Sequence, residues 1–283
     1  MKQSLFDPRR CELGEGAFWH PQRRQVFWFD ILGRRLLSRH DGRELEWRFD
    51  DHVSAAGWID THRLLIASAT ALLDFNLETG ESRVLTPLEA DNPRTRSNDG
   101  RTDPWGGFWI GTMALDAAPR QGAIYRFHRG ELRRLHDRIS IPNAICFAPD
   151  RSLAYFADTA RQAVFRQTLD AEGWPAADPQ VFLDFSGSDE FPDGAVTDAA
   201  GNFWNARWST GRLVCHAPDG RQIAEVSIPA KQATCPAFMG EALDQILLTS
   251  AAEGLDGPQD GQSWHILPPP GTRGLPEPRI ILP

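Results

Sequence analysis

Short apolar and aromatic runs recur along the chain at a spacing of about 45 residues, each followed by two further runs and a turn. The first run of each unit covers residues 24–30, 62–67, 107–110, 152–156, 201–204 and 244–249. The following runs cover 35–39 and 45–49, 71–76 and 82–85, 123–127 and 132–135, 163–167 and 181–185, 212–217 and 223–228, and 263–267 and 278–282. Their length and their Asp-Gly or Thr-Gly turns indicate β-hairpins rather than helices.

Six such units, repeated without interruption, predict the fold of the whole chain. A small twisted sheet cannot bury both faces alone, so repeated sheets of this size stack around an axis. We therefore predict an all-β protein, a six-bladed β-propeller with about four antiparallel strands per blade, in one domain over residues 1–283. A pair of β-sandwiches is the structural alternative, but no linker interrupts the repeat. A TIM barrel would need eight long helices, and the sequence shows no helical period.

Composition and charge narrow the class of protein. The chain has 283 residues with a formal net charge of −8 and no basic run, which argues against nucleic-acid or anionic-membrane partners. No apolar segment has the length of a membrane helix, and the N-terminus lacks the apolar core of a signal peptide. Four cysteines without paired spacing suggest neither disulfides nor a thiolate zinc site. These features predict a cytoplasmic location.

The stretch 96–113, RSNDGRTDPWGGFWIGTM, contains the greatest density of polar oxygens beside an aromatic run. Asn98-Asp99-Gly100 is predicted to be a turn, and residues 108–110 a strand that we place next to the channel. Similar oxygen-bearing turns precede other blades. The candidates are Glu15, Arg96, Asn98, Asp99, Asn143 and Asp193. Because loops at the ends of a propeller channel carry function, we expect these side chains to converge at one mouth.

Two carboxylates and an amide carbonyl form an all-oxygen donor set. Such a set suits Ca²⁺, Mg²⁺ or Mn²⁺, and Zn²⁺ could bind if water completed its coordination. The eight histidines are scattered and do not pair at metal-ligand spacing. A serine-hydrolase elbow and a phosphate-binding glycine loop are both missing from the sequence.

These motifs resemble a known family: the propellers grouped as senescence marker protein (regucalcin), gluconolactonase and luciferin-regenerating enzyme. The resemblance covers nearly the whole chain. NDGxxDPxGxFWxGTM is the specific motif, and GEGAFWH, IPNAICFAPD, YFADT, FPDGAVTDAAGNFWNARWSTGRLVCHAPDG and RGLPEPR support it. It implies a six-bladed propeller with one divalent metal ion, Ca²⁺ first, in the channel.

The resemblance also implies roles for individual residues. Glu15, Asn143 and Asp193 would be the metal ligands, and Asp193 would also be the catalytic acid and base. Arg96 and Asn98 would bind the substrate. The implied activity is a gluconolactonase-like sugar lactonase, a carboxylic ester hydrolase that opens a sugar lactone to the aldonic acid with metal-polarised carbonyl and metal-activated water.

Four residues depart from or extend this pattern. Ala17 stands where the family more often has proline. Arg207 stands where the family usually has an uncharged residue, and we hypothesise that it faces the channel and binds an anionic substituent of the sugar. Arg101 and Trp105 are further candidates for the same mouth.

Two other functions stay open at this point. One is a non-catalytic, calcium-binding regulatory propeller of the regucalcin kind, which would share the site but not turn over a lactone. The other is a propeller that only binds a partner, which would not need oxygen ligands ahead of four blades. The sequence leaves the oligomeric state, the sugar and its ring size open.

Overall fold

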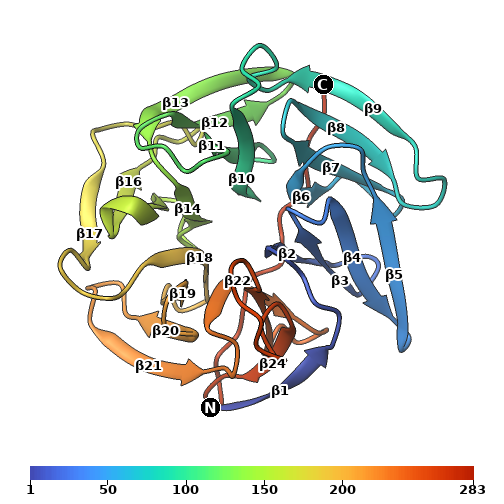
Figure 1. Cartoon of the computed structure of the whole chain (residues 1–283). Coiled ribbons are helices and arrows are strands. Elements are labelled where there is room, and N and C mark those ends of the chain that lie inside the picture. Colours follow the sequence, from blue (N-terminus) through green and yellow to red (C-terminus); the bar gives the residue numbers. More distant parts are fainter.

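A computed structural model describes all residues, 1–283. Six four-stranded antiparallel sheets stand around a central axis, as Figure 1 shows. The only helix is a single 3₁₀ turn, Thr159–Arg161, so the prediction of an all-β six-bladed propeller is confirmed. No helix in the structure combines the length and apolar character needed to cross a membrane.

The strands follow one another from the axis to the rim in each blade. Blade one contains β2 (Gly14–His20), β3 (Gln25–Asp30), β4 (Arg35–His40) and β5 (Arg43–Arg48). Blade two contains β6 (Val53–Trp58), β7 (Arg63–Ser68), β8 (Ala71–Asn76) and β9 (Ser82–Pro87). Blade three contains β10 (Thr95–Thr102), β11 (Phe108–Ala114), β12 (Gly122–His128) and β13 (Glu131–Ile139).

The second half of the chain repeats the arrangement. Blade four contains β14 (Pro142–Phe147), β15 (Leu153–Asp158), β16 (Ala163–Thr168) and β17 (Gln180–Asp184). Blade five contains β18 (Pro192–Thr197), β19 (Phe203–Arg207), β20 (Arg212–His216) and β21 (Gln222–Ser227). Blade six contains β22 (Gln232–Met239), β23 (Gln245–Ala251), β24 (Ser263–Leu267) and β1 (Lys2–Asp7).

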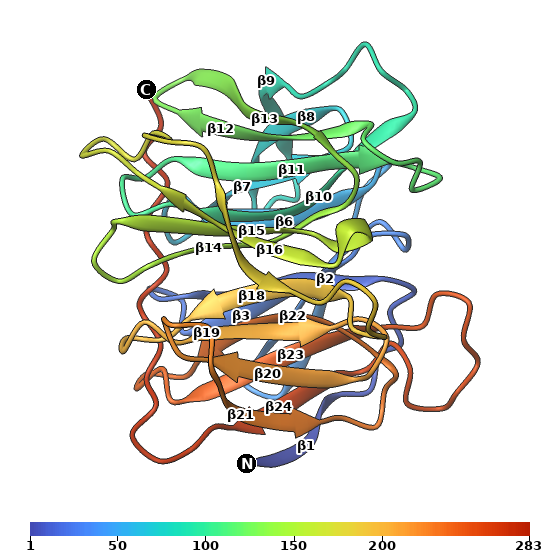
Figure 2. The same cartoon turned by 90° about the vertical axis from the view of Figure 1, so that its left-hand side faces the viewer.

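Blade six is closed by the N-terminus rather than by the C-terminus. β1 pairs antiparallel with β24, and Leu5 lies opposite Trp264. The predicted strand 278–282 is therefore wrong: these residues form no strand and cross the back of the ring instead. Backbone N–H groups of Ile280 and Ile281 donate to Trp58 O and Gly106 O, both at 2.9 Å. This segment, seen at the left of Figure 2, ties blades two and three together.

Hydrophobic packing lies between the blades. The six apolar clusters of the structure each join two neighbouring blades, so every blade face finds a partner. In the cluster between blades six and one, for example, Trp28 and Leu37 pack with Ala237 and Leu247. The aromatic residues of the predicted first strands supply these clusters, because residues two apart on a strand share a face.

The innermost strands differ from the prediction. The aromatic runs are the second strands of the blades, and the axis is lined by β2, β6, β10, β14, β18 and β22. Asn98-Asp99-Gly100 is accordingly not a turn but part of β10. All six innermost strands begin at the same end of the channel, which we call the site mouth, and end at the opposite end, the far mouth.

Candidate functional site

The candidate ligands lie at irregularities in the innermost strands. The pairing register shifts between Glu15 and Phe18, between Ser97 and Gly100, between Asn143 and Cys146, and between Pro192 and Ala195. Such a bulge inserts an extra residue, bends the strand and re-aims the side chain there. Register shifts at equivalent positions occur in all six innermost strands, and in these four blades they direct polar side chains toward the same part of the channel.

The bulge of β2 depends on a glycine. Gly16 has φ +56°, and a Cβ at this position would lie 2.1 Å from Ser54 O in blade two. Only glycine combines this left-handed conformation with so close an approach of another backbone. Gly16 N donates to Glu15 Oε2 at 3.0 Å, which fixes the carboxyl group beside its own backbone. Glu15 is thus held rigidly, although it stands between two glycines.

A chain of hydrogen bonds joins blades three, four and five at the site mouth. Arg96 Nη1 donates to Asn98 Oδ1 at 2.8 Å, and Asn98 Nδ2 donates to Asn143 Oδ1 at 3.1 Å. Asn143 Nδ2 donates to Thr159 Oγ1 at 2.8 Å, and this hydroxyl donates to Pro192 O at 2.7 Å. Because the Asn143 amide group gives its N–H to Thr159, its carbonyl oxygen is turned toward Asn98 and the channel.

Two carboxyl groups face each other across the channel. Glu15 and Asp193 are both at most 4% exposed, and each carboxyl group affects the pKa of the other. Burial, with the nearby Asp99 carboxylate, raises the pKa of Glu15 to about 8. Burial and the Glu15 charge hold the pKa of Asp193 well above its usual range. No arginine or lysine forms an ion pair with either carboxyl group within 4.0 Å.

Asp99 adds a third carboxyl group to the channel. Its Oδ2 accepts from Ile145 N at 2.7 Å, so it links β10 to β14. Burial raises the pKa of Asp99 to about 6. Asp99 therefore adds negative charge to the surroundings of Glu15 and Asp193 while its own oxygen is used by the backbone.

The residues present fit a divalent cation. Asp193 Oδ1 is buried and has no hydrogen-bond partner, and the neighbouring carboxyl groups of Glu15 and Asp193 have no basic partner within 4.0 Å. Such an arrangement is costly unless a proton or a cation is shared. Two carboxylates and the Asn143 carbonyl are hard oxygen donors. The structure contains no group of three or more His, Cys, Asp or Glu side chains with metal-ligand geometry.

Arg96 lies beside this donor set without pairing with it. Burial lowers the pKa of Arg96 to about 10, while the charges of Glu15, Glu253 and Asp193 act in the opposite direction. Its Nη1 is occupied by Ser97 O and Asn98 Oδ1. Glu253, exposed on the loop after β23, was not among the predicted residues and adds a carboxylate at the rim of the site mouth.

Arg207 is not brought together with the other predicted residues. It is fully buried in β19, where Nε donates to Glu190 Oε2 at 2.9 Å and the guanidinium carbon lies 4.3 Å from the centre of the Phe185 ring. Its Nη1 and Nη2 have no partner, and burial lowers its pKa to about 9. Phe185 follows β17, the outermost strand of blade four. These contacts place the guanidinium between blades four and five.

Two further residues that support the site were missed from the sequence. Thr159 orients Asn143 through a hydrogen bond to its amide group. It lies in the motif YFADT, which the family resemblance includes without giving the threonine a role. Asn205 Nδ2 donates to Asp193 O at 2.7 Å and to Gly194 O at 3.0 Å, which fixes the bulge of β18. Asn205 lies within one of the supporting family motifs, but its role depends on backbone groups of the neighbouring strand, which the motif alone does not reveal.

Comparison with known proteins places the chain in a family. The model of the SMP-30/gluconolactonase/LRE-like region matches residues 13–252. The chain belongs to the SMP-30/gluconolactonase/LRE-like family. The resemblance drawn from the sequence motifs is thereby confirmed.

Individual relatives are similar over most of their length. One is a protein of Rhizobium meliloti (strain 1021) whose name assigns it provisionally to the sugar lactone lactonases, 41% identical over 87% of this chain and 84% of its own. Another is the 6-deoxy-6-sulfogluconolactonase of Pseudomonas putida, 33% identical over 85% of this chain and 84% of its own.

A solved structure has nearly the same fold. It is described as a calcium-binding protein, regucalcin, from Agrobacterium tumefaciens str. C58, and it is 38% identical with a TM-score of 0.94 over 98% of this chain and 97% of its own. The family therefore contains proteins named for lactone hydrolysis and proteins named for calcium binding.

Proposed function

We propose that this protein is a sugar lactonase that opens a sugar lactone to its aldonic acid and depends on one divalent cation bound by Glu15, Asn143 and Asp193. The observation that carries the proposal is the buried, uncompensated pair of Glu15 and Asp193 beside the oriented Asn143 carbonyl. The lactonase names of relatives that are a third or more identical support the reaction class. Burying two neighbouring carboxyl groups costs free energy, and a protein whose function involves no cation would gain nothing from this arrangement.

The cation would be Ca²⁺ first, with Mn²⁺, Mg²⁺ and Zn²⁺ as alternatives, because all three donors are oxygens. When bound, it would supply Lewis-acid polarisation of the lactone carbonyl and lower the pKa of a water molecule. The calcium-binding description of the similar Agrobacterium structure supports this choice.

Asp193 would move the proton. Its Oδ1 has no partner in the protein, so it can accept a proton from the attacking water and return it to the ring oxygen when the ester bond breaks. In the metal-free protein, burial and the Glu15 charge raise the pKa of Asp193, and a bound cation would lower it again. Asn205 keeps the backbone of Asp193 and Gly194 in place during these steps.

Arg96 and Asn98 would bind the sugar. The buried guanidinium group of Arg96 offers fixed donors at the site mouth. Its hydrogen bond to Asn98 Oδ1 also fixes the orientation of the Asn98 amide group. If Asn143 Oδ1 turns to the cation, one N–H of Asn98 becomes available to a sugar hydroxyl. Both residues therefore connect substrate binding to the donor set.

The role of Arg207 stays a prediction. Its contacts favour a structural role. Arg207 forms an ion pair with Glu190, which lies three residues before Asp193 and also contacts Arg212. We therefore propose that Arg207 stabilises the loop that leads into β18. Binding of an anionic substituent would require this loop to open toward the channel.

The experiment is a lactone panel followed by pH-stat titration with a protein-free blank. The panel includes gluconolactone, pentonolactones and 6-deoxy-6-sulfogluconolactone. We expect acid release above the blank that stops with EDTA and returns with one of the four metals. Asp193→Asn should remove it, and Asp178→Asn, which alters an exposed aspartate far from the site, should not.

Absence of release with every lactone and metal would reject the lactonase. Binding of Ca²⁺ with that result would favour a non-catalytic regulatory propeller, which is the alternative function.

A further inference from the structure

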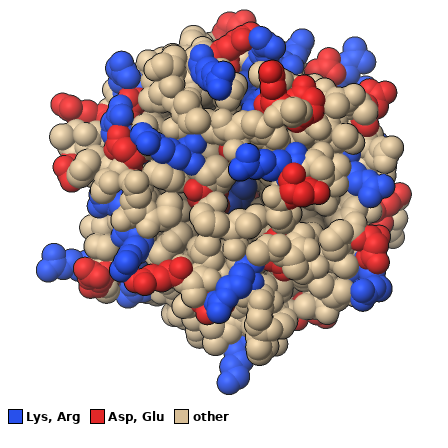
Figure 3. All heavy atoms as spheres, turned by 180° about the vertical axis from the view of Figure 1, so that it is seen from behind, with Lys and Arg blue, Asp and Glu red and all other residues tan.

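A cavity occupies the far mouth of the channel. It has a volume of about 960 Å³ and is lined by the last residues of β10, β14 and β18 and by the C-terminal segment 275–282. Figure 3 shows this face of the molecule, with a hollow near its middle and basic side chains at and inside the hollow. The donor set of the site mouth lies at the opposite ends of the same strands, so the two sites are separate.

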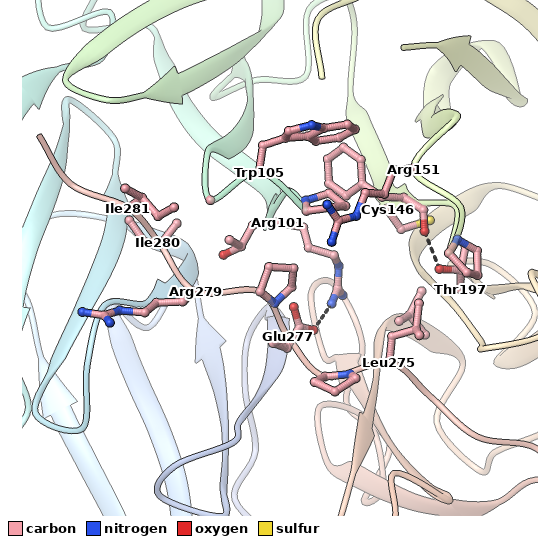
Figure 4. Close-up of a pocket in the computed structure, with 18 of the residues that line it drawn as sticks. Arg101, Trp105, Cys146, Arg151, Thr197, Leu275, Glu277, Arg279, Ile280 and Ile281 are labelled. Atoms are coloured by element: carbon pink, nitrogen blue, oxygen red, sulfur yellow. Dashed lines mark hydrogen bonds and ion pairs between the residues drawn. The ribbon is translucent and has the colours of Figure 1, made fainter. Parts of the chain in front are cut away.

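Arginines dominate the charge of this cavity. Its wall contains Arg63, Arg101, Arg151 and Arg279 but only one acidic residue, Glu277, in a protein whose net charge is −8. Arg63 is paired with Asp60 and Asp74, and the guanidinium group of Arg279 points away from the centre in Figure 4. Arg101 and Arg151 remain, and Glu277, the partner of Arg101, is the only carboxylate of the wall set against them, so this part of the cavity keeps a net positive charge.

Arg101 is buried at the base of the cavity and is only partly satisfied. It is 8% exposed and forms an ion pair with Glu277. Its Nε has no partner, and its Nη2 reaches carbonyl oxygens only at 3.4 and 3.5 Å. These distances are long for charge-assisted hydrogen bonds. A buried guanidinium group with spare donors is a strong attractor for an anionic oxygen.

Arg151 reaches into the same space from the turn after β14. It forms no ion pair, and Figure 4 shows its guanidinium group directed toward that of Arg101. Glu277 balances only one of these two positive charges, so an anion bound beside the two guanidinium groups would balance the other. Their arrangement therefore favours a ligand with a carboxylate or sulfonate group.

The rest of the wall is apolar. Trp105, Phe147, Leu275 and Ile281 line the cavity, and Ile281 is 49% exposed. An apolar lining with a few convergent polar groups is typical of small-molecule sites, and the volume falls within their usual range. A polyhydroxylated sugar acid would leave its hydroxyl groups against this wall unpaired, so the lining does not suit the product proposed for the site mouth.

We propose that the far-mouth cavity is a second binding site, for a small apolar carboxylate whose anionic group lies between Arg101 and Arg151 and whose apolar body packs against Trp105 and Ile281. The C-terminal segment that crosses this face of the ring supplies one wall of the site. The site does not depend on the cation or on lactone turnover.

The test uses 2-naphthoate as the probe and its neutral amide as the control. Ligand-detected NMR measures the binding of each compound to the full chain. We expect naphthoate to bind at least about tenfold more tightly than the amide, because only the acid can pair with the arginines. Gluconolactone should not displace it. Failure of naphthoate to bind at millimolar concentration, or equal binding of the amide, would overturn the proposal.

Variants locate the ligand. Arg151→Gln should weaken naphthoate binding about tenfold, whereas Arg48→Gln, on the exposed rim strand β5, should leave it unchanged. Ile281→Asp should abolish binding by placing a carboxylate on the wall, and the isosteric Ile281→Asn should retain most of it. Both Ile281 variants keep the backbone bond to Gly106, so folding is preserved. Displacement of naphthoate by gluconolactone, or unaltered binding in Arg151→Gln and Ile281→Asp, would place the probe elsewhere and reject the site.

Discussion

The two mouths of the channel are built from the same strands but carry opposite chemistry. At the site mouth, Glu15 and Asp193 face each other beside the oriented Asn143 carbonyl. At the far mouth, Arg101 and Arg151 face a cavity with an apolar wall. β10 contributes to both, with Arg96 near its start and Arg101 near its end. At about 3.3 Å per residue, five positions carry the chain roughly 16 Å along the axis.

The difference shows how a propeller separates two sites without a second domain. Bulges re-aim side chains only where the innermost strands begin, and there they collect oxygen donors. Where these strands end, no such bulge occurs, and the C-terminal segment covers part of the opening. One end is therefore suited to a cation and the other to an anion.

The largest expected effect tests the site mouth directly. Asp193→Asn should lower kcat/KM for lactones by about a thousandfold or more, because it removes a cation ligand and the proton acceptor together. In the metal-free protein the same change should raise the melting temperature, since it removes one of two facing buried charges. Steady-state kinetics and calorimetry with EDTA measure the two effects. A metal-free variant that melts well below the parent would argue against uncompensated charge at this pair.

Arg151→Gln provides the matching far-mouth comparison. Its lactone kinetics should stay close to those of the parent, because the residue lies at the opposite end of the channel. A large loss of turnover in this variant would mean that the two mouths are not independent.

The next largest expected effect is a change with pH in how much a bound cation raises the melting temperature of the protein. The pKa of Glu15 is raised to about 8 in the metal-free fold, so the stability linked to its proton is complete below the ordinary carboxyl pKa and is lost as pH rises toward about 8. A cation replaces that proton, and the rise in melting temperature on adding Ca²⁺ should therefore grow from pH 5.5 to pH 8.5. Thermal scans with and without Ca²⁺ measure it. An equal rise at both pH values would contradict a donor set that contains these carboxyl groups.

A smaller effect decides the role of Arg207. Arg207→Ala should lower kcat/KM several-fold to a similar degree for neutral lactones and for 6-deoxy-6-sulfogluconolactone, because the residue contacts Glu190 and Phe185 rather than the channel. Paired kinetics on the two substrates measure the ratio. A selective loss of tenfold or more on the sulfonated lactone would instead show that Arg207 binds the anionic group, as the sequence suggested.

The smallest effect lies away from both mouths, in blade five. Burial, with the nearby Arg207 charge, lowers the pKa of His216 to about 4. A buried neutral histidine contributes stability that is complete above the unfolded pKa of about 6.5 and is lost as pH falls toward about 4. Relative to His216→Phe, the parent should lose roughly 1–2 kcal/mol between pH 7 and pH 5. Denaturant unfolding at both pH values measures this loss, and parallel losses in the two proteins would contradict it.

Much of the fold could be predicted because the second, third and fourth strands of the blades have simple patterns. The runs around Trp28, Phe156 and Trp204 are apolar, β-branched or aromatic, and they bury both faces between blades. Their turns carry the expected glycines, such as Gly220 with φ +90°. Six repeats of this kind leave few alternatives to a propeller.

The innermost strands could not be predicted in the same way. β10, β14 and β18 contain Asn, Asp, Gly and Pro, residues that ordinarily indicate turns, and Asn98-Asp99-Gly100 was interpreted as one. These strands are stabilised by neighbours on both sides and by bulges, so tertiary pairing overrides local preference. The last strand of blade six was also misplaced, because closure by β1 joins residues at opposite ends of the chain.

The sequence by itself determined the all-β repeat and the family, and it singled out the oxygen-bearing residues Glu15, Asn143 and Asp193 that we propose as donors, because residue types and motifs are local properties. The tertiary structure decided what those donors face. It placed Arg101 at the far mouth, buried Arg207 between two blades, and brought Thr159 and Asn205 to support Asn143 and Asp193. These contacts depend on the direction of each strand and on closure of the ring. Both bring together residues that are far apart in the sequence, so no short stretch of sequence predicts them.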